Sequence, residues 1–149
     1  WAPHLHMSQS LSIMNMMIKE EETWAITIKP MDTVVGTLSL TARTFHDALD
    51  NQKELGYVID EPYWGQGYIV EASLGILDYA FNDLALDKVL CAHEPHNVQS
   101  KRVIEKLGFC YSHHDIRKNY VGLNMQLNVY QMTKALYKEL YNESIKNKI

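Results

Sequence analysis

Residues 54–84 predict a strand, a turn with two glycines and a long helix in immediate succession. The strand covers ELGYVID (54–60), and Pro62 ends it because a proline ring cannot donate a ladder hydrogen bond. From residue 68 to residue 84, apolar side chains recur at helical steps, which predicts one wide apolar face. A strand that leads into such a helix indicates a sheet with helices packed on it.

An amphipathic helix is also predicted upstream, over residues 8–22. Ser8 or Ser10 is the expected N-cap, because a serine side chain accepts a hydrogen bond from a free backbone N–H at a helix start. Methionine-rich stripes are usually part of a core, so we expect the apolar stripe of this helix to be buried. The stripe consists of Leu11, Met14, Met17 and Ile18.

The other elements complete an α+β, or mixed α/β, pattern. Two runs rich in β-branched residues, 23–29 and 34–42, predict a hairpin around residues 30–32. Asn97 is placed to cap a later helix, and Gly108 is placed to end it in a left-handed turn. The further predicted elements are a strand over 88–94, a helix over 97–108, strands over 109–115 and 127–135, and a short helix or fraying tail over 137–149.

Composition and charge narrow the class of protein. At 149 residues the chain has the size of one domain, and we expect 1–149 to fold as a single unit. The formal net charge of −4 leaves no broad basic field for nucleic acid, and no apolar run approaches the roughly 18–20 residues of a membrane span. Cys91 and Cys110 are too few for a disulfide scaffold, which favours a reduced, cytoplasmic protein.

The turn Gly65-Gln66-Gly67 carries the clearest chemical signal. A glycine-rich turn before a helix presents backbone N–H groups at the positive end of the helix dipole, where they bind phosphate without a basic side chain. A tight turn with no ligand is about as compatible with a Gly-x-Gly pair alone. ATP and NAD binding are disfavoured, because no Gly-x4-Gly-Lys-Ser/Thr run exists and Val70 stands where a dinucleotide fingerprint needs its third glycine.

Three spaced segments together resemble the GNAT acetyltransferases. They are ELGYVIDEPYWGQGYIVEA (54–72), LDYAFNDLALDKV (77–89) and N-x-x-S-x-R-V-I-E-K-L-G-F (97–109). The resemblance runs from about Trp24 to Tyr130 and is nearest to the enzymes that acetylate the N-termini of ribosomal proteins. It implies a GNAT fold, with a central twisted mixed β-sheet flanked by helices. Family members begin with a further strand and helix, so we expect an N-terminus that is truncated relative to the family, or a missing first strand.

The resemblance also implies a binding site for acetyl-CoA. The family's pyrophosphate loop falls on residues 64–69, where Ile69 departs from the usual Gly or Ala and must point its side chain away from the phosphates. The strand backbone near Ile59 is expected to contact the pantetheine arm, and Asn97 and Ser100 are expected on the other side of that arm. The implied cofactor-binding residues are Val58, Ile59, Trp64, Gly65, Gln66, Gly67, Tyr68, Ile69, Asn97 and Ser100.

The family chemistry implied by the resemblance is direct attack of an amine on the thioester, which needs a base, an oxyanion donor and an acid for the thiolate. Glu54 is the candidate base, and a solvated or salt-bridged strand-edge carboxylate is an equal alternative. A backbone N–H of residues 58–59 is the candidate oxyanion donor. Ile104 stands where many relatives carry a tyrosine acid. The resemblance to this branch implies Ser100 as the candidate acid, which would protonate or hydrogen-bond the thiolate. The alternatives are that Ser100 only fixes the helix start or contacts the coenzyme, and that a thiolate stable near pH 7 needs no dedicated acid.

No metal site is expected, because the cysteine and histidine spacings match no familiar zinc finger and strand residues alternate between faces. Surface positions are expected for His113 and His114, with a place at the substrate mouth as the alternative. The residues that invite a zinc interpretation are Cys91, His93, His96, Cys110, His113 and His114.

We therefore expect an N-acetyltransferase that moves an acetyl group from acetyl-CoA to a primary amine, first of all a protein or peptide N-terminus. The alternatives are a small amine or antibiotic-like acceptor, and an acyl-CoA-binding domain without turnover. Neither nucleic acid nor a membrane is an expected partner, and a homodimer is compatible with the sequence. Acceptor identity depends on residues 8–22 and 112–127, which match the family least.

Overall fold

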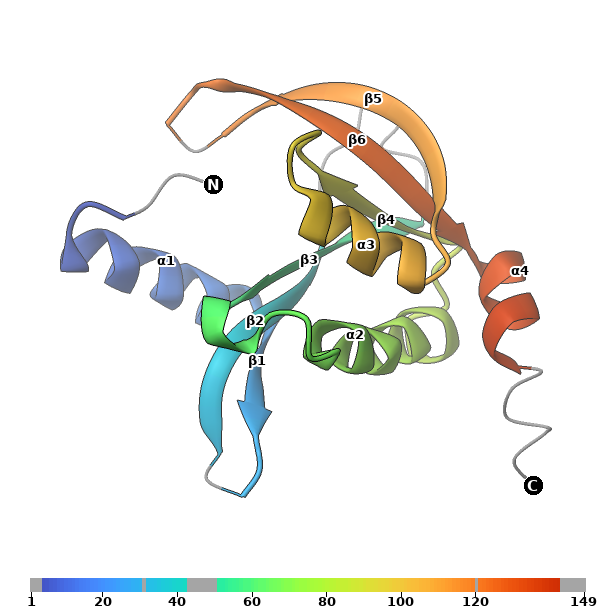
Figure 1. Ribbon diagram of the computed structural model, residues 1–149, viewed down its shortest axis with the longest axis horizontal. Helices are drawn as coiled ribbons and strands as arrows, with labels where there is room; N and C mark the ends of the chain where they lie inside the picture. Colours follow the sequence, from blue (N-terminus) through green and yellow to red (C-terminus); the bar gives the residue numbers. More distant parts are fainter. Residues whose placement is uncertain (1–3, 31, 43–50, 120, 143–149) are drawn as a thin grey trace.

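The computed structural model describes residues 4–30, 32–42, 51–119 and 121–142. Its centre is a six-stranded sheet in the order β1-β2-β3-β4-β6-β5, with helices packed against it (Figure 1). The strands are β1 (Thr23–Ile28), β2 (Thr33–Thr41), β3 (Gln52–Ile59), β4 (Lys88–His93), β5 (Cys110–Lys118) and β6 (Asn124–Thr133). The α-helices are α1 (Met7–Glu20), α2 (Tyr68–Asp78), α3 (Val98–Lys106) and α4 (Lys134–Tyr137).

The sheet is mixed, which confirms the predicted α+β class. β3 and β4 pair in parallel, and the chain passes between them through α2, because parallel neighbours need a crossover connection. Every other neighbouring pair is antiparallel, including the β1–β2 hairpin that the sequence predicts. The sheet therefore combines an N-terminal meander with a crossover unit and a C-terminal hairpin.

The main core lies between the sheet and the pair α2 and α3. Leu77 and Phe81 belong to the predicted apolar face of residues 68–84, and both are fully buried. Leu55 from β3 and Ile104 from α3 belong to the same cluster. A smaller cluster of Leu90, Leu127 and Val129 lies apart from this core. Because side chains alternate along a strand, β3 and β4 contribute to both faces of the sheet.

Two predictions for the N-terminal helix are wrong. α1 has no buried residue, and the stripe predicted as core is not buried, with Leu11 47% exposed and Ile18 66% exposed. Helical spacing determines which side chains share a face, but tertiary contacts decide whether that face is covered. The N-cap is His6 rather than Ser8 or Ser10, and its side chain makes no cap hydrogen bond.

The structure differs from the sequence predictions more in where the elements end than in whether each is a helix or a strand. α2 stops at Asp78 and continues as a π-helical turn over Tyr79–Asp83, so the predicted helix 68–84 is two pieces. The C-terminal strands β5 and β6 extend toward each other beyond the predicted ranges. α4 and a π-helical turn over Lys138–Asn142 partly match the predicted C-terminal helix, and residues 143–149 lie outside the described part. Among the described residues, no helix is long and apolar enough to cross a membrane.

Candidate active site

A divergence between two parallel strands defines the site. β3 and β4 pair from Gln52–Lys88 to Leu55–Cys91 and no further. Beyond that point β3 stays paired with β2 as far as Ile59, and β4 stays paired with β6 as far as His93. The ends of the two strands therefore separate, and residues 56–59 no longer have β4 as their neighbour.

A groove of about 470 Å³ opens where the strands separate. It runs between the end of β3, the loop that leads into α2, and one face of α3. It brings together all the predicted cofactor-binding residues except Gln66. The lining residues are Tyr57, Val58, Ile59, Tyr63, Trp64, Gly65, Gly67, Tyr68, Ile69, Val70, Asn97, Gln99, Ser100, Arg102, Val103 and Lys106.

The loop before α2 needs its two glycines for their backbone conformation. Gly65 has φ +73° and Gly67 has φ +87°, values that side-chain-bearing residues rarely adopt. A Cβ at either position would meet no atom within 4 Å, so backbone conformation, and not lack of space, calls for glycine. Trp64 braces the loop by donating from its indole Nε1 to the Ile59 carbonyl at 2.8 Å. Gln66, the predicted residue outside the groove lining, donates instead to the Pro62 carbonyl at 2.9 Å.

The start of α3 forms the opposite wall. Asn97 is the N-cap, as predicted, and its Oδ1 accepts from the Ser100 backbone N–H at 3.0 Å. The Ser100 hydroxyl lies 2.9 Å from the hydroxyl of Tyr57, which reaches across from β3. This cap fixes the first turn of α3, so that Ser100 and Tyr57 face the same groove.

Glu54 lies on the other face of β3. Leu55, Tyr57 and Ile59 pack with the helix-covered core, and alternation places Glu54 on the opposite side. There Glu54 is 8% exposed, and its Oε2 accepts from Arg117 Nη1 at 2.6 Å. The salt-bridged alternative thus describes its contact. Glu54 is not at a sheet edge, because β3 lies between β2 and β4.

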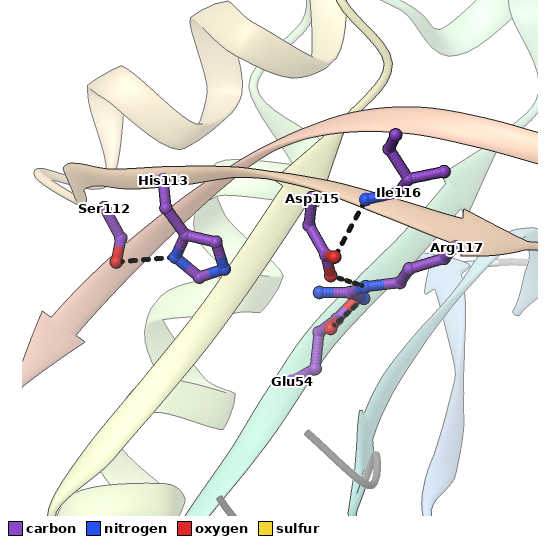
Figure 2. Close-up of polar contacts among 6 residues, drawn as sticks. All are labelled: Glu54, Ser112, His113, Asp115, Ile116 and Arg117. Carbon is purple, nitrogen blue, oxygen red and sulfur yellow. Dashed lines mark hydrogen bonds and ion pairs between the residues drawn. The ribbon is translucent and has the colours of Figure 1, made fainter. Parts of the chain in front are cut away.

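Arg117 bridges two carboxylates, as Figure 2 shows. Its Nε donates to Asp115 Oδ2 at 2.7 Å, and this hydrogen bond holds the pKa of Asp115 below its usual value. Burial disfavours the charged guanidinium, but the hydrogen bonds to Asp115 and Glu54 outweigh burial and raise the pKa of Arg117. Ser112 and His113 hydrogen-bond to each other earlier in β5, away from these ion pairs (Figure 2).

The sequence interpretation missed three groove residues with useful chemistry. Arg102 and Lys106 bring two positive charges to the groove, and neither forms an ion pair within the described residues. Their signal was the helical spacing from Gln99 through Arg102 and Val103 to Lys106 on one face of α3. Tyr57 could also have been identified from the sequence, because Leu55, Tyr57 and Ile59 occupy every second position of β3 and share its helix-covered side.

The two residues that depart from the family's motif are both buried apolar side chains. Ile69 is 5% exposed and packs in the main core, so its bulk is turned into the protein. Ile104, at the position where the resemblance implies a tyrosine acid, is fully buried in the same core. Burial also raises the pKa of the Cys91 thiol, so Cys91 keeps its proton near neutral pH and is not a reactive thiolate. No group of three or more metal-binding side chains occurs within the described ranges.

The family profile of the acetyltransferase (GNAT) domain matches residues 1–110. The chain belongs to the GNAT acetyltransferase family. It is 36% identical over 90 residues to YjcK of Bacillus subtilis, a probable N-acetyltransferase, over 60% of this chain and 49% of that protein. The chain thus spans about half the length of that relative.

Solved structures share the GNAT fold. A ribosomal-protein alanine acetyltransferase from Vibrio fischeri superposes with a TM-score of 0.71 at 21% identity, over 90% of this chain and 78% of that one. A variant of the spermidine N-acetyltransferase of Vibrio cholerae superposes with a TM-score of 0.70 at 17% identity, over 95% of this chain and 82% of that one. At these identities the likeness concerns the fold alone.

Proposed function

We propose that this GNAT domain transfers an acetyl group from acetyl-CoA to a primary amine. The observation that carries the proposal is the position of the two left-handed glycines. Gly65 and Gly67 lie at the N-terminus of α2 and open into the same groove as residues 57–59 of β3, beyond the point where β3 and β4 separate. One groove therefore offers an anion-binding helix start beside strand backbone that has no strand neighbour on its β4 side.

Successive parts of the groove would bind successive parts of acetyl-CoA. Backbone N–H groups of residues 65–69 at the positive end of α2 would hold the pyrophosphate. Arg102 and Lys106 on α3 would neutralise further phosphate charge, since both face the groove. The pantetheine arm would then lie between Ile59 and Asn97, with the thioester near Ser100.

The reaction uses both faces of β3. An amine nitrogen forms a bond to the acetyl carbon, the carbon–sulfur bond breaks, and its electron pair leaves with the sulfur. The nitrogen's excess proton passes to Glu54, directly or through water, on the face opposite the coenzyme groove. Asp60 donates its backbone N–H to Val35 of β2 at 2.9 Å, so alternation turns the Ile59 N–H toward the gap. Of residues 58–59, Ile59 is therefore the candidate oxyanion donor.

A protein or peptide N-terminus is the first acceptor class, in line with the sequence resemblance to ribosomal-protein acetyltransferases. A small amine is the second, because the spermidine enzyme from Vibrio cholerae has the same fold. Both acceptors present a primary amine, and both must release a proton before or during attack. The proposed transfer chemistry is the same for either class.

Calorimetric titration with acetyl-CoA, with NAD and ATP as controls, tests the groove. Mass spectrometry of peptides and of spermidine after incubation with the protein and acetyl-CoA tests transfer. Micromolar affinity for acetyl-CoA alone, with an added acetyl mass on one acceptor class, supports the proposal. Binding without transfer to any acceptor supports an acyl-CoA-binding domain instead, and absence of binding rejects both.

A further inference from the structure

The hydroxyl groups of Tyr57 and Ser100 form a pair at the wall of the groove. Tyr57 Oη lies 2.9 Å from Ser100 Oγ and 3.1 Å from the Ser100 carbonyl oxygen. Both residues line the groove, so the pair faces the coenzyme side of β3. Tyr57 thereby connects the end of a strand to the first turn of α3.

The Tyr57 proton has two oxygen acceptors within reach, both on Ser100, and the Tyr57 hydroxyl also interacts with the Cys91 thiol. When Tyr57 donates to the Ser100 carbonyl, the Ser100 hydroxyl is free to donate to Tyr57 Oη. When Tyr57 donates to Ser100 Oγ, the single Ser100 proton is released for another acceptor in the groove. A hydroxyl group carries one proton and two acceptor lone pairs, so the second arrangement makes Ser100 a donor.

We propose, on the basis of the acetyl transfer proposed above, that Tyr57 is a positioning residue that turns the Ser100 hydroxyl toward the departing sulfur of coenzyme A. Tyr57 donates to Ser100 Oγ, and Ser100 donates a hydrogen bond to the thiolate as the carbon–sulfur bond breaks. No proton leaves either hydroxyl. The amine's proton goes to the Glu54 side of the strand, and the coenzyme leaves as a hydrogen-bonded thiolate.

Three features of the pair fit this role. Burial raises the pKa of Tyr57 above its ordinary value, so its hydroxyl keeps its proton at neutral pH. The Asn97 cap holds the Ser100 backbone at 3.0 Å, which limits movement of the serine. Ile104 is fully buried and does not line the groove, so its side chain does not come between the two hydroxyl groups and the groove.

The test compares Tyr57→Phe, Ser100→Ala and the double variant. We expect Tyr57→Phe to lower kcat about tenfold, because Ser100 is then no longer held to donate its hydrogen bond to the developing thiolate, and to leave the Kd of acetyl-CoA unchanged. Because Tyr57 acts through Ser100, the double variant should be no slower than Ser100→Ala alone. A kcat of Tyr57→Phe within twofold of wild type, or multiplying losses in the double variant, overturns the proposal.

Tyr141→Phe is the matched control. The Tyr141 hydroxyl donates to the Leu107 carbonyl at 2.7 Å, so this variant also removes a phenolic hydrogen bond to α3, but at its C-terminal end. We expect Tyr141→Phe to lower thermal stability as Tyr57→Phe does and to keep the wild-type kcat. An equal loss of kcat in both variants would assign Tyr57 a structural role only.

A binding measurement keeps the proposal testable if no acceptor is acetylated. Coenzyme A and its desulfo analogue are titrated calorimetrically between about pH 7 and about pH 10. The wild type should prefer coenzyme A increasingly as its thiol ionises, and Tyr57→Phe should lose that preference. A pH-independent ratio of the two affinities in the wild type rejects the proposal, whereas failed acetyl transfer with a rising ratio rejects only the proposed function.

Discussion

Glu54 combines a candidate catalytic role with an observed ion pair. Its carboxylate is nearly buried and accepts from Arg117, so its orientation is fixed by a residue of β5. The same guanidinium also holds Asp115, which leaves the two carboxylates on one cation (Figure 2). Substitutions at positions 54 and 115 therefore each remove one ion pair from the same guanidinium, but only Glu54 has a role in the proposed chemistry.

We expect Glu54→Gln to lower kcat/KM for acetyl transfer about 10²- to 10⁴-fold, because an amide cannot take the proton of the amine. The Kd of acetyl-CoA should not change, since Glu54 lies outside the groove lining. Steady-state kinetics and calorimetry measure the two quantities. Asp115→Asn is the control and should keep kcat/KM within a few fold. If Glu54→Gln behaves like Asp115→Asn, Glu54 serves only to hold Arg117.

Gly67 is a second position where one residue's backbone decides function. In Gly67→Ala, the positive φ becomes strained at a cost of about 1 kcal/mol, and the loop shifts its N–H groups. We expect a lower melting temperature and at least tenfold weaker acetyl-CoA binding. Gly122→Ala is the matched control, because Gly122 also has a positive φ of +82° and open space around it. It should lose similar stability and keep its coenzyme affinity.

At the scale of elements, the spacing between β2 and β3 determines where the groove-lining strand lies. Gly36 of β2 is so close to β3 that an added Cβ would overlap the Val58 carbonyl oxygen. A close approach of this kind requires glycine, because the obstructing atom is main chain. Gly36 thus sets the position of the end of β3 that lines the groove, although Gly36 itself does not line the groove.

Gly36→Ala should therefore push β3 away from β2 beside Val58 and Ile59. We expect a loss of about 1–3 kcal/mol in the free energy of unfolding and weaker acetyl-CoA binding. Chemical denaturation and calorimetry check the two effects. Gly75→Ala in α2 is the contrasting variant, since nothing lies within 4 Å of its added Cβ. It should raise stability by about 0.5–1 kcal/mol, and an equal outcome for both variants would contradict the close-approach explanation.

Local features of the site could be predicted from sequence, and long-range ones could not. The Gly65–Gly67 turn and the Asn97 cap depend on neighbours along the chain, so their spacing was sufficient. The Glu54–Arg117 pair joins residues 63 positions apart, and no pattern in either strand indicates that β5 reaches over β3. The apolar stripe of α1 shows the same limit, because its spacing predicts a helix face but not what covers that face.

At the scale of the whole molecule, the C-terminal segment is tied to the crossover helix. Tyr137 stacks on Phe81 with ring centroids 4.8 Å apart, and its hydroxyl donates to Asp78 at 2.9 Å. Burial, with Asp78 nearby, raises the pKa of Tyr137 from 10.0 to about 12. The protonated phenol is therefore favoured in the folded state more than in the unfolded chain.

This shift makes the fold sensitive to alkaline pH. Below pH 10 both states keep the proton, and the stabilisation is fully present; as the pH rises from 10 toward 12, the unfolded chain ionises first and stability is lost. We expect Tyr137→Phe to be less stable near neutral pH but to lose less stability over that alkaline range. Melting temperatures between about pH 8 and about pH 11 measure this. Parallel curves for the two proteins would contradict it.

The alternation along β3 has an evolutionary consequence. Side chains at 55, 57 and 59 face the helix-covered core, whereas that of Glu54 meets β5 on the reverse side. Alternate codons of a single short gene segment therefore encode two surfaces of the protein, and the insertion or deletion of one codon would exchange the residues of the two surfaces.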